Sequence, residues 1–224
     1  MEAFRHAVER VMGKPADQLD CALMASVQRQ LMEVADAING IRPLAELTDV
    51  EKRECSKTSS VKRYPAECVV YDEDRDFSLV PGDAYFLLEG QCLGVQRLRV
   101  RKRLVAGHDR YALVQDVGER DGPQCQTVYV KTSELRPGSV FCIGERSEGG
   151  RLVLSITEVK YLLVPFAFLA KHNTANVWGR TACSLDSSAL TVRESFRKFV
   201  VSKKWEEYKK STVEAVVLKW KTEK

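Results

Sequence analysis

The 224-residue sequence lacks any apolar run of the roughly 18 residues that a membrane-spanning helix needs. Its first residues include Glu2, Glu9 and Arg10, and they do not show the basic start followed by an apolar stretch that is typical of a secretion signal. We therefore expect a soluble protein without a membrane span in an intracellular, cytoplasmic location.

Cysteine and histidine are present, but they are not arranged for metal binding. The seven cysteines form no Cys-x-x-Cys pair, and His6, His108 and His172 lie far apart in the sequence. An odd number of scattered cysteines favours free thiols in a reducing compartment. The sequence also shows no Ser/His/Asp, Cys/His or paired-carboxylate arrangement, so we expect neither a metal site nor an enzyme.

The net charge is also small: 35 basic residues accompany 31 acidic ones, which leaves +4. A charge this small does not by itself indicate a nucleic-acid partner, and we expect none. Arg97, Arg99 and Arg101 alternate with apolar residues and would share one face of a strand. A second basic cluster lies near the C-terminus and comprises Arg193, Arg197, Lys198, Lys203, Lys204, Lys209 and Lys210. Both clusters fit a solvated surface, and the alternative is a polyanion- or cytoskeleton-binding patch.

Apolar residues recur at helical spacing in the first forty residues and predict helices over 2–12 and 18–37. A further short helix is indicated by Thr48, because Glu51 follows it at the spacing of a capping box.

The C-terminal part of the sequence changes character twice. Residues 173–188 are rich in Ser, Thr, Ala and Asn and predict a loose stretch. Residues 192–220 predict one or two amphipathic helices, interrupted near Val201-Ser202. Their aromatic anchors, which we expect to be buried against the rest of the protein, are Trp205, Tyr208 and Trp220.

Between residues 61 and 164 the pattern turns to short β-favouring runs separated by Gly, Pro and Asp. Several short strands of this kind indicate a sandwich or roll. Residues 107–123 are polar and predict an extended hairpin. Residues 151–164 form the longest β-favouring run and predict two closing strands, followed by the start of a helix.

Two motifs in the β region are more specific. The run Pro81-Gly82-Asp83-Ala84-Tyr85-Phe86-Leu87-Leu88-Glu89-Gly90 resembles the Gly-Asp-x-x-Tyr/Phe-x-x-x-x-Gly turn and strand of the cyclic nucleotide-binding domain family. The run Arg136-Pro137-Gly138-Ser139-Val140-Phe141-Cys142-Ile143-Gly144-Glu145 resembles, in altered form, the Gly-x-x-Phe-Gly-Glu entry to that family's phosphate-binding cassette.

The resemblance implies a mainly β fold with flanking helices, in which an antiparallel, jelly-roll-like β-roll carries N-terminal helices and C-terminal amphipathic helices. Gly82, Asp83 and Gly90 are its fold-motif residues. The roll would span residues 41–172, after an N-terminal helical segment (1–40) and before a linker with C-terminal helices packed on the roll (173–224).

The resemblance also implies ligand-binding candidates, which are Gly138, Phe141, Gly144, Glu145, Arg146 and Arg151. Cys142 and Ile143 stand where the family has Gly and Glu, and a shift of two residues lets Gly144-Glu145 restore both. Arg151 is then the phosphate-binding arginine.

A second count leaves the arginine open. Thr157-Glu158-Val159 stands in the place of the family's Thr-Asp-Val turn, and counting back from it puts Gly149 at the arginine position. The cassette is shorter than in the family, and residues 146–150 replace its short helix with turn-forming residues.

Three functions follow as hypotheses. The first is a non-enzymatic regulatory or scaffolding module that has a degenerate cassette and acts through protein partners. The second is a cyclic AMP or cyclic GMP sensor with Glu145 on the ribose and Arg151 on the phosphate, and no other cofactor is implied. The third is the polyanion-binding module. A narrower resemblance, to sperm-associated cyclic nucleotide-binding domain-containing proteins, implies association with the flagellum or cytoskeleton.

Overall fold

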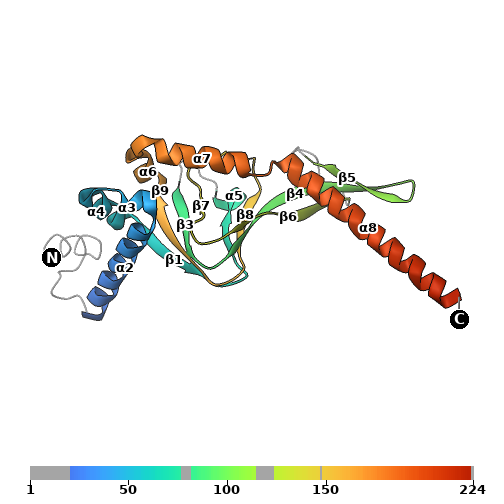
Figure 1. Cartoon of the computed structure of the whole chain (residues 1–224), viewed down its shortest axis with the longest axis horizontal. Coiled ribbons are helices and arrows are strands. Elements are labelled where there is room, and N and C mark those ends of the chain that lie inside the picture. Colours follow the sequence, from blue (N-terminus) through green and yellow to red (C-terminus); the bar gives the residue numbers. More distant parts are fainter. Residues whose placement is uncertain (1–20, 77–81, 115–123, 147, 223–224) are drawn as a thin grey trace.

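A computed structural model describes residues 21–76, 82–114, 124–146 and 148–222. The helix expected over residues 2–12, Pro81 and most of the far arm of the expected hairpin lie outside them. The fold is mainly β with flanking helices, as expected (Figure 1). The helices are α2 (Cys21–Gly40), α3 (Arg42–Ala45), α4 (Asp49–Thr58), α5 (Glu73–Asp76), α6 (Phe166–Lys171), the 3-10 turn η2 (Thr174–Asn176), α7 (Val177–Ser188) and α8 (Val192–Thr222).

Two antiparallel sheets form the β-roll. One has the strand order β1-β9-β3-β7, and the other has the order β2-β8-β4-β5, with β6 also paired to β4. The strands are β1 (Ser60–Tyr64), β2 (Val69–Asp72), β3 (Asp83–Glu89), β4 (Cys92–Val105), β5 (His108–Leu113), β6 (Cys125–Leu135), β7 (Val140–Phe141), β8 (Arg151–Ser155) and β9 (Val159–Pro165). The closing strands predicted over 151–164 are therefore β8 and β9, and α6 follows them as expected.

The core lies between the sheets and continues under the helices. Tyr161 and Leu163 of β9 point into the roll, where they join Phe141 and Leu87, all nearly inaccessible to solvent. Because side chains alternate across a strand, Leu162 points the other way. It packs in a second cluster with residues of α2, α6 and α7. Strand β9 thus holds the roll to its helical cover.

Gly90 has a backbone reason to be glycine. Its φ is +87°, and a Cβ at this position would lie 2.3 Å from the carbonyl oxygen of Glu158. The other end of β3 is fixed where the N–H of Phe166 donates to the carbonyl oxygen of Gly82 at 3.0 Å. Asp83 is the first residue of the strand. The motif recognised in the sequence therefore frames β3.

The capping box at the start of α4 is confirmed. The Glu51 carboxylate accepts from the N–H of Thr48 at 2.8 Å, and Thr48 Oγ1 accepts from the N–H of Glu51. Glu51 also lies 2.9 Å from Nδ1 of His172, in the turn after α6. These bonds, above all those from Thr48, lower the pKa of Glu51 from 4.5 to about 2.

This pKa predicts how acid affects the fold. A carboxyl whose folded pKa is depressed adds stability at neutral pH, and that stability is lost as the pH falls from about 4.5 towards about 2. We expect Glu51→Gln to lose less stability than the wild type when both are acidified from pH 7 into this range. Urea midpoints at the two pH values measure this, and equal losses in the two proteins would contradict it.

Two C-terminal expectations are wrong. Residues 177–188 form the helix α7 where a loose stretch was expected. Its core contacts, Trp178, Ala182 and Leu185, have helical spacing, but Gly, Arg, Thr and Ser between them obscure the pattern. Helix α8 is continuous from Val192 to Thr222, with no interruption near Val201-Ser202.

The aromatic residues of α8 that were expected to be buried are also exposed. Phe199 is buried against Leu98 and Val100 of β4, so the first half of the helix packs on the roll. Trp205, Tyr208 and Trp220 are more than half exposed. Figure 1 shows why: the helix crosses the long strands β4 to β6 and then leaves them. Its second half has no sheet beneath it.

Candidate functional site

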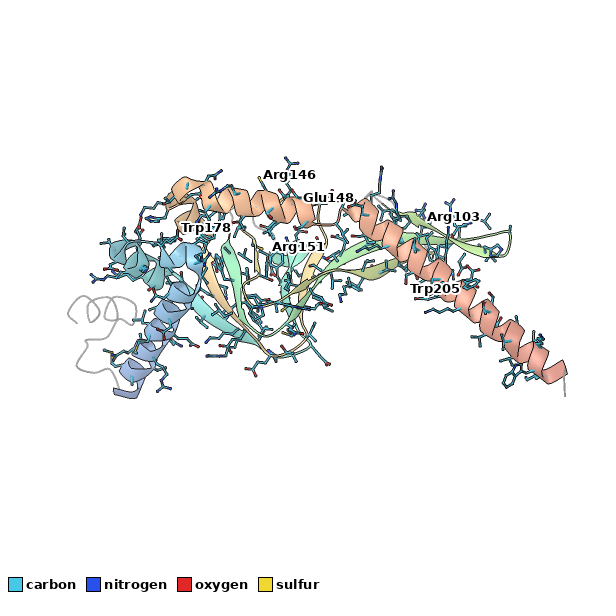
Figure 2. All side chains as sticks on the ribbon, viewed as in Figure 1. Arg103, Arg146, Glu148, Arg151, Trp178 and Trp205 are labelled. Atoms are coloured by element: carbon cyan, nitrogen blue, oxygen red, sulfur yellow. The ribbon has the colours of Figure 1, made fainter. Side chains whose placement is uncertain are left out.

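The loop that corresponds to the cassette runs from Cys142 to Gly150, between β7 and β8. Its described residues form no helix, in agreement with the turn-forming residues there. Two left-handed glycines at its end, Gly149 (φ +83°) and Gly150 (φ +75°), lead the chain into β8. The loop and Arg151 lie beneath α7 (Figure 2).

Glu145 is the centre of this loop. One carboxylate oxygen accepts from the N–H of Cys142 at 2.6 Å, and the other accepts from the N–H of Ile143 at 2.7 Å. The guanidinium of Arg151 donates to the same carboxylate at 2.9 Å. Only 6% of the Glu145 side chain is exposed, against 32% for Arg151. Two amides and an arginine therefore form an anion site that Glu145 occupies itself.

Two more carboxylates bind the far end of the loop. Asp74 accepts from the N–H of Gly150 at 2.9 Å, and Glu73 accepts from the N–H of Arg151 at 3.0 Å. Both acids belong to α5, directly after β2, and Glu73 is buried. Two backbone amides at this end of the loop are thus bound to carboxylates of the same chain.

The helices above the loop are tied to it in the same way. Asp186 of α7 accepts from the N–H of Arg146 at 2.7 Å. Glu148 accepts from the N–H of Val192, the first residue of α8, at 2.7 Å. Both bonds hold the helical cover against the loop.

Phe141 belongs to the core. It is fully buried, stacks on Tyr85 with 4.8 Å between ring centroids, and packs against Tyr71 and Tyr161. The guanidinium carbon of Arg151 lies 5.7 Å from the centre of its ring. Phe141 therefore supports Arg151 from below.

Cys142 has an unusual backbone conformation for a non-glycine residue, with φ at +62°. Burial raises the pKa of its thiol to about 12, and the negative charge of Glu145 adds to the shift. The thiol is therefore protonated at neutral pH and unreactive.

The other predicted ligand-binding residues, Gly138, Gly144 and Arg146, have different surroundings from Glu145 and Arg151. Gly138 lies in the turn before β7, where its N–H donates to the carbonyl oxygen of Leu87 at 2.8 Å. Gly144 has a φ of +92° and faces the ring of Phe166. The Arg146 side chain is exposed and points away from the roll (Figure 2). Arg151, at the start of β8, does bring its guanidinium to Glu145.

The positive charge of the arginines on β4 is partly neutralised. Arg97 pairs with Asp72 at 3.1 Å and also with Asp74. The alternation expected from the sequence is present, since Leu98 and Val100 are buried between the arginines. The acids Glu73, Asp74 and Asp186 were missed as site residues. The acidic run that follows Tyr71 was the available signal for the first two.

Within residues 21–76, 82–114, 124–146 and 148–222 there is no group of three or more His, Cys, Asp or Glu side chains that could hold a metal ion. None of the helices in these same ranges is long and apolar enough to cross a membrane.

No family model matches the chain, and no curated protein matches it. Solved structures do resemble it. One is described as a cyclic nucleotide-binding protein from Geobacter metallireducens, with 16% identity and a TM-score of 0.38, covering 69% of this chain and 93% of that one.

Two others are longer proteins, of which this chain spans about half. The regulatory domain of Toxoplasma gondii PKA, solved with cAMP, has 9% identity and a TM-score of 0.46, covering 71% of this chain and 52% of that one. The regulatory subunit of a cAMP-independent protein kinase A from Trypanosoma brucei has 15% identity and a TM-score of 0.44, covering 71% and 49%.

Proposed function

We propose that this chain is a non-enzymatic regulatory or scaffolding module whose nucleotide cassette is closed by its own carboxylates. The observation that carries the proposal is the Glu145 carboxylate, which bonds to two backbone amides and to Arg151 at 6% side-chain exposure. The module then acts through contacts with other macromolecules inside the cell. Its roll spans residues 41–172, and the helices on either side are its contact elements.

The energetics favour the closed state. A cyclic nucleotide carries one negative charge, as does Glu145. A bound nucleotide would therefore replace one anion by another at these donors, without a gain in charge pairing. Glu145 is already in place and loses no translational freedom on binding, whereas a free ligand does. The displaced carboxylate would also need new partners, because a buried unpaired charge is costly.

One observation favours the sensor as a second candidate. Glu145 and Arg151 are in contact at 2.9 Å, and they are the two residues to which the shift of two residues assigns the ribose and the phosphate. A rotation of Glu145 would release Arg151 to a phosphate and keep the carboxylate near the sugar. The two candidates therefore differ in whether Glu145 leaves its amides.

Calorimetric titration with cyclic AMP and then cyclic GMP, each to millimolar excess, separates them. The closed cassette predicts no saturable heat from wild-type protein whose fold has been verified. Micromolar binding that Arg151→Ala abolishes would overturn the proposal and establish the sensor. Lys62→Glu changes an exposed charge on β1, away from the loop, and is the control variant: it should leave any nucleotide binding unchanged.

A further inference from the structure

Helix α8 carries an apolar stripe on the side that faces away from the roll. Val192, Phe196 and Phe199 pack on the roll, and Val201, Trp205 and Tyr208 each follow one of them by nine residues. Nine residues are about two and a half helical turns, so the second set lies opposite the first. Trp205 is 54% exposed and Tyr208 is 59% exposed.

The stripe continues along the second half of α8, through exposed Val216 to Trp220, which is 72% exposed. Here the helix has left the roll, and the projecting end is clear of the β4–β5 hairpin (Figure 1). The hairpin contact reaches Glu207, whose carboxylate lies 3.1 Å from His108. From Val201 to Trp220 the stripe is about 28 Å long at 1.5 Å per residue.

Basic residues outnumber acidic ones around the stripe. Residues 201–222 contain six lysines and three glutamates. Glu206 pairs with Lys203 at 2.7 Å, Glu214 lies 4.0 Å from Lys210, and Glu207 faces His108. On the outward side, basic side chains accompany the aromatic residues: Arg197, Lys198, Lys204, Lys209 and Lys219. The ammonium of Lys209 lies 5.2 Å from the ring centre of Trp205.

We propose that this outward stripe of α8 docks on the surface of an anionic membrane, with Trp205 and Trp220 in the headgroup layer. Trp and Tyr have an apolar body and a polar tip, which suits them to this layer, and lysine can extend its ammonium to lipid phosphates. Exposed tryptophans that stand among lysines on one helix suit binding in the plane of the interface.

A flat negative surface fits better than the other occupants of such a face. The roll lies on the opposite side of α8, so an extended plane can approach the stripe without meeting it. The cations are spread from Arg197 to Lys219 and not gathered at one point, which suits a continuous negative surface. A second copy would bring the same positive stripe against this one, and like charges repel.

Co-sedimentation with lipid vesicles tests the proposal. Full-length wild type should bind vesicles of phosphatidylcholine that contain about one third phosphatidylserine, and should bind far less to pure phosphatidylcholine. Binding should weaken as salt is added, since salt screens exposed charges. Trp205→Ala combined with Trp220→Ala should lower the partition coefficient by roughly tenfold or more. Lys204→Glu combined with Lys209→Glu should have an effect of similar size.

Two control variants match these changes. Tyr129→Ala removes an exposed aromatic residue from β6, and Lys62→Glu reverses an exposed charge on β1, so both should leave binding unchanged. All the altered side chains are exposed, so thermal melting should show each variant folded. Absence of wild-type binding to the anionic vesicles would overturn the proposal. Vesicle binding that the double tryptophan substitution leaves unchanged would overturn it too. Self-association without lipid that this double substitution abolishes would also overturn it, because the stripe would then bind a second copy of the chain.

Discussion

Replacing Glu145 by alanine should lower the free energy of unfolding by about 3 kcal/mol, which is the lower end of the cost of breaking a buried ion pair. The substitution leaves the Arg151 guanidinium without this partner and removes the acceptor of two amides, those of Cys142 and Ile143. Unpaired buried donors carry a desolvation cost of their own. The lower end of the range applies because Arg151 is 32% exposed and water can reach it. Urea denaturation measures the change.

Two further variants define what the change means. Glu145→Gln keeps an acceptor oxygen and loses the charge, so it should fall between wild type and alanine. Glu134 forms a surface ion pair with Lys131, and Glu134→Ala should have no measurable effect on the midpoint. If Glu145→Ala is as stable as wild type, the carboxylate does not hold the loop, and the closed cassette is the wrong description.

Replacing Phe141 by alanine should cost about 4 kcal/mol of stability, as large-to-small changes of buried aromatic residues do. The ring is fully buried and is surrounded by Tyr71, Tyr85 and Tyr161, whose own positions leave little room for collapse. Phe141→Leu refills part of the volume and should cost less. Denaturation of both variants and of the surface control Tyr129→Ala supplies the comparison.

This result decides between two roles for Phe141. As a core residue it should affect stability strongly. As a ligand-contacting residue it would affect nucleotide binding while the alanine variant stayed nearly as stable as wild type, and that outcome would contradict the packing described here.

Local signals allowed much of the fold to be predicted. The alternation of residues in β4, the capping box at Thr48 and the glycine that ends β3 each depend on neighbours within a few positions. Helix α7 was missed because the residues between its core contacts hide their helical spacing. The burial of the second half of α8 was predicted wrongly for a different reason. Whether an apolar helical face is buried depends on how far the sheet beneath it extends, and the sequence of the helix does not contain that length.

The candidate site divides in the same way. Glu145 and Arg151 were identified because Glu145 ends one recognisable motif and Arg151 follows it by only six residues. Glu73 lies 78 residues from the amide that it binds, and Asp186 lies 40 residues from its own. Only the pairing of β2 with β8 and the placement of α7 over the loop bring these acids to it. An acidic turn after a strand resembles ordinary surface until that pairing is known.

The occupancy of the anion site by Glu145 is tested most directly at the two amides that it binds. The backbone N–H resonances of Cys142 and Ile143 can be followed by NMR while cyclic AMP, and then cyclic GMP, are added to wild-type protein. The closed cassette predicts that neither resonance moves up to millimolar nucleotide. Shifts of both that saturate in the micromolar range would show that a phosphate reaches these donors, and would contradict the account.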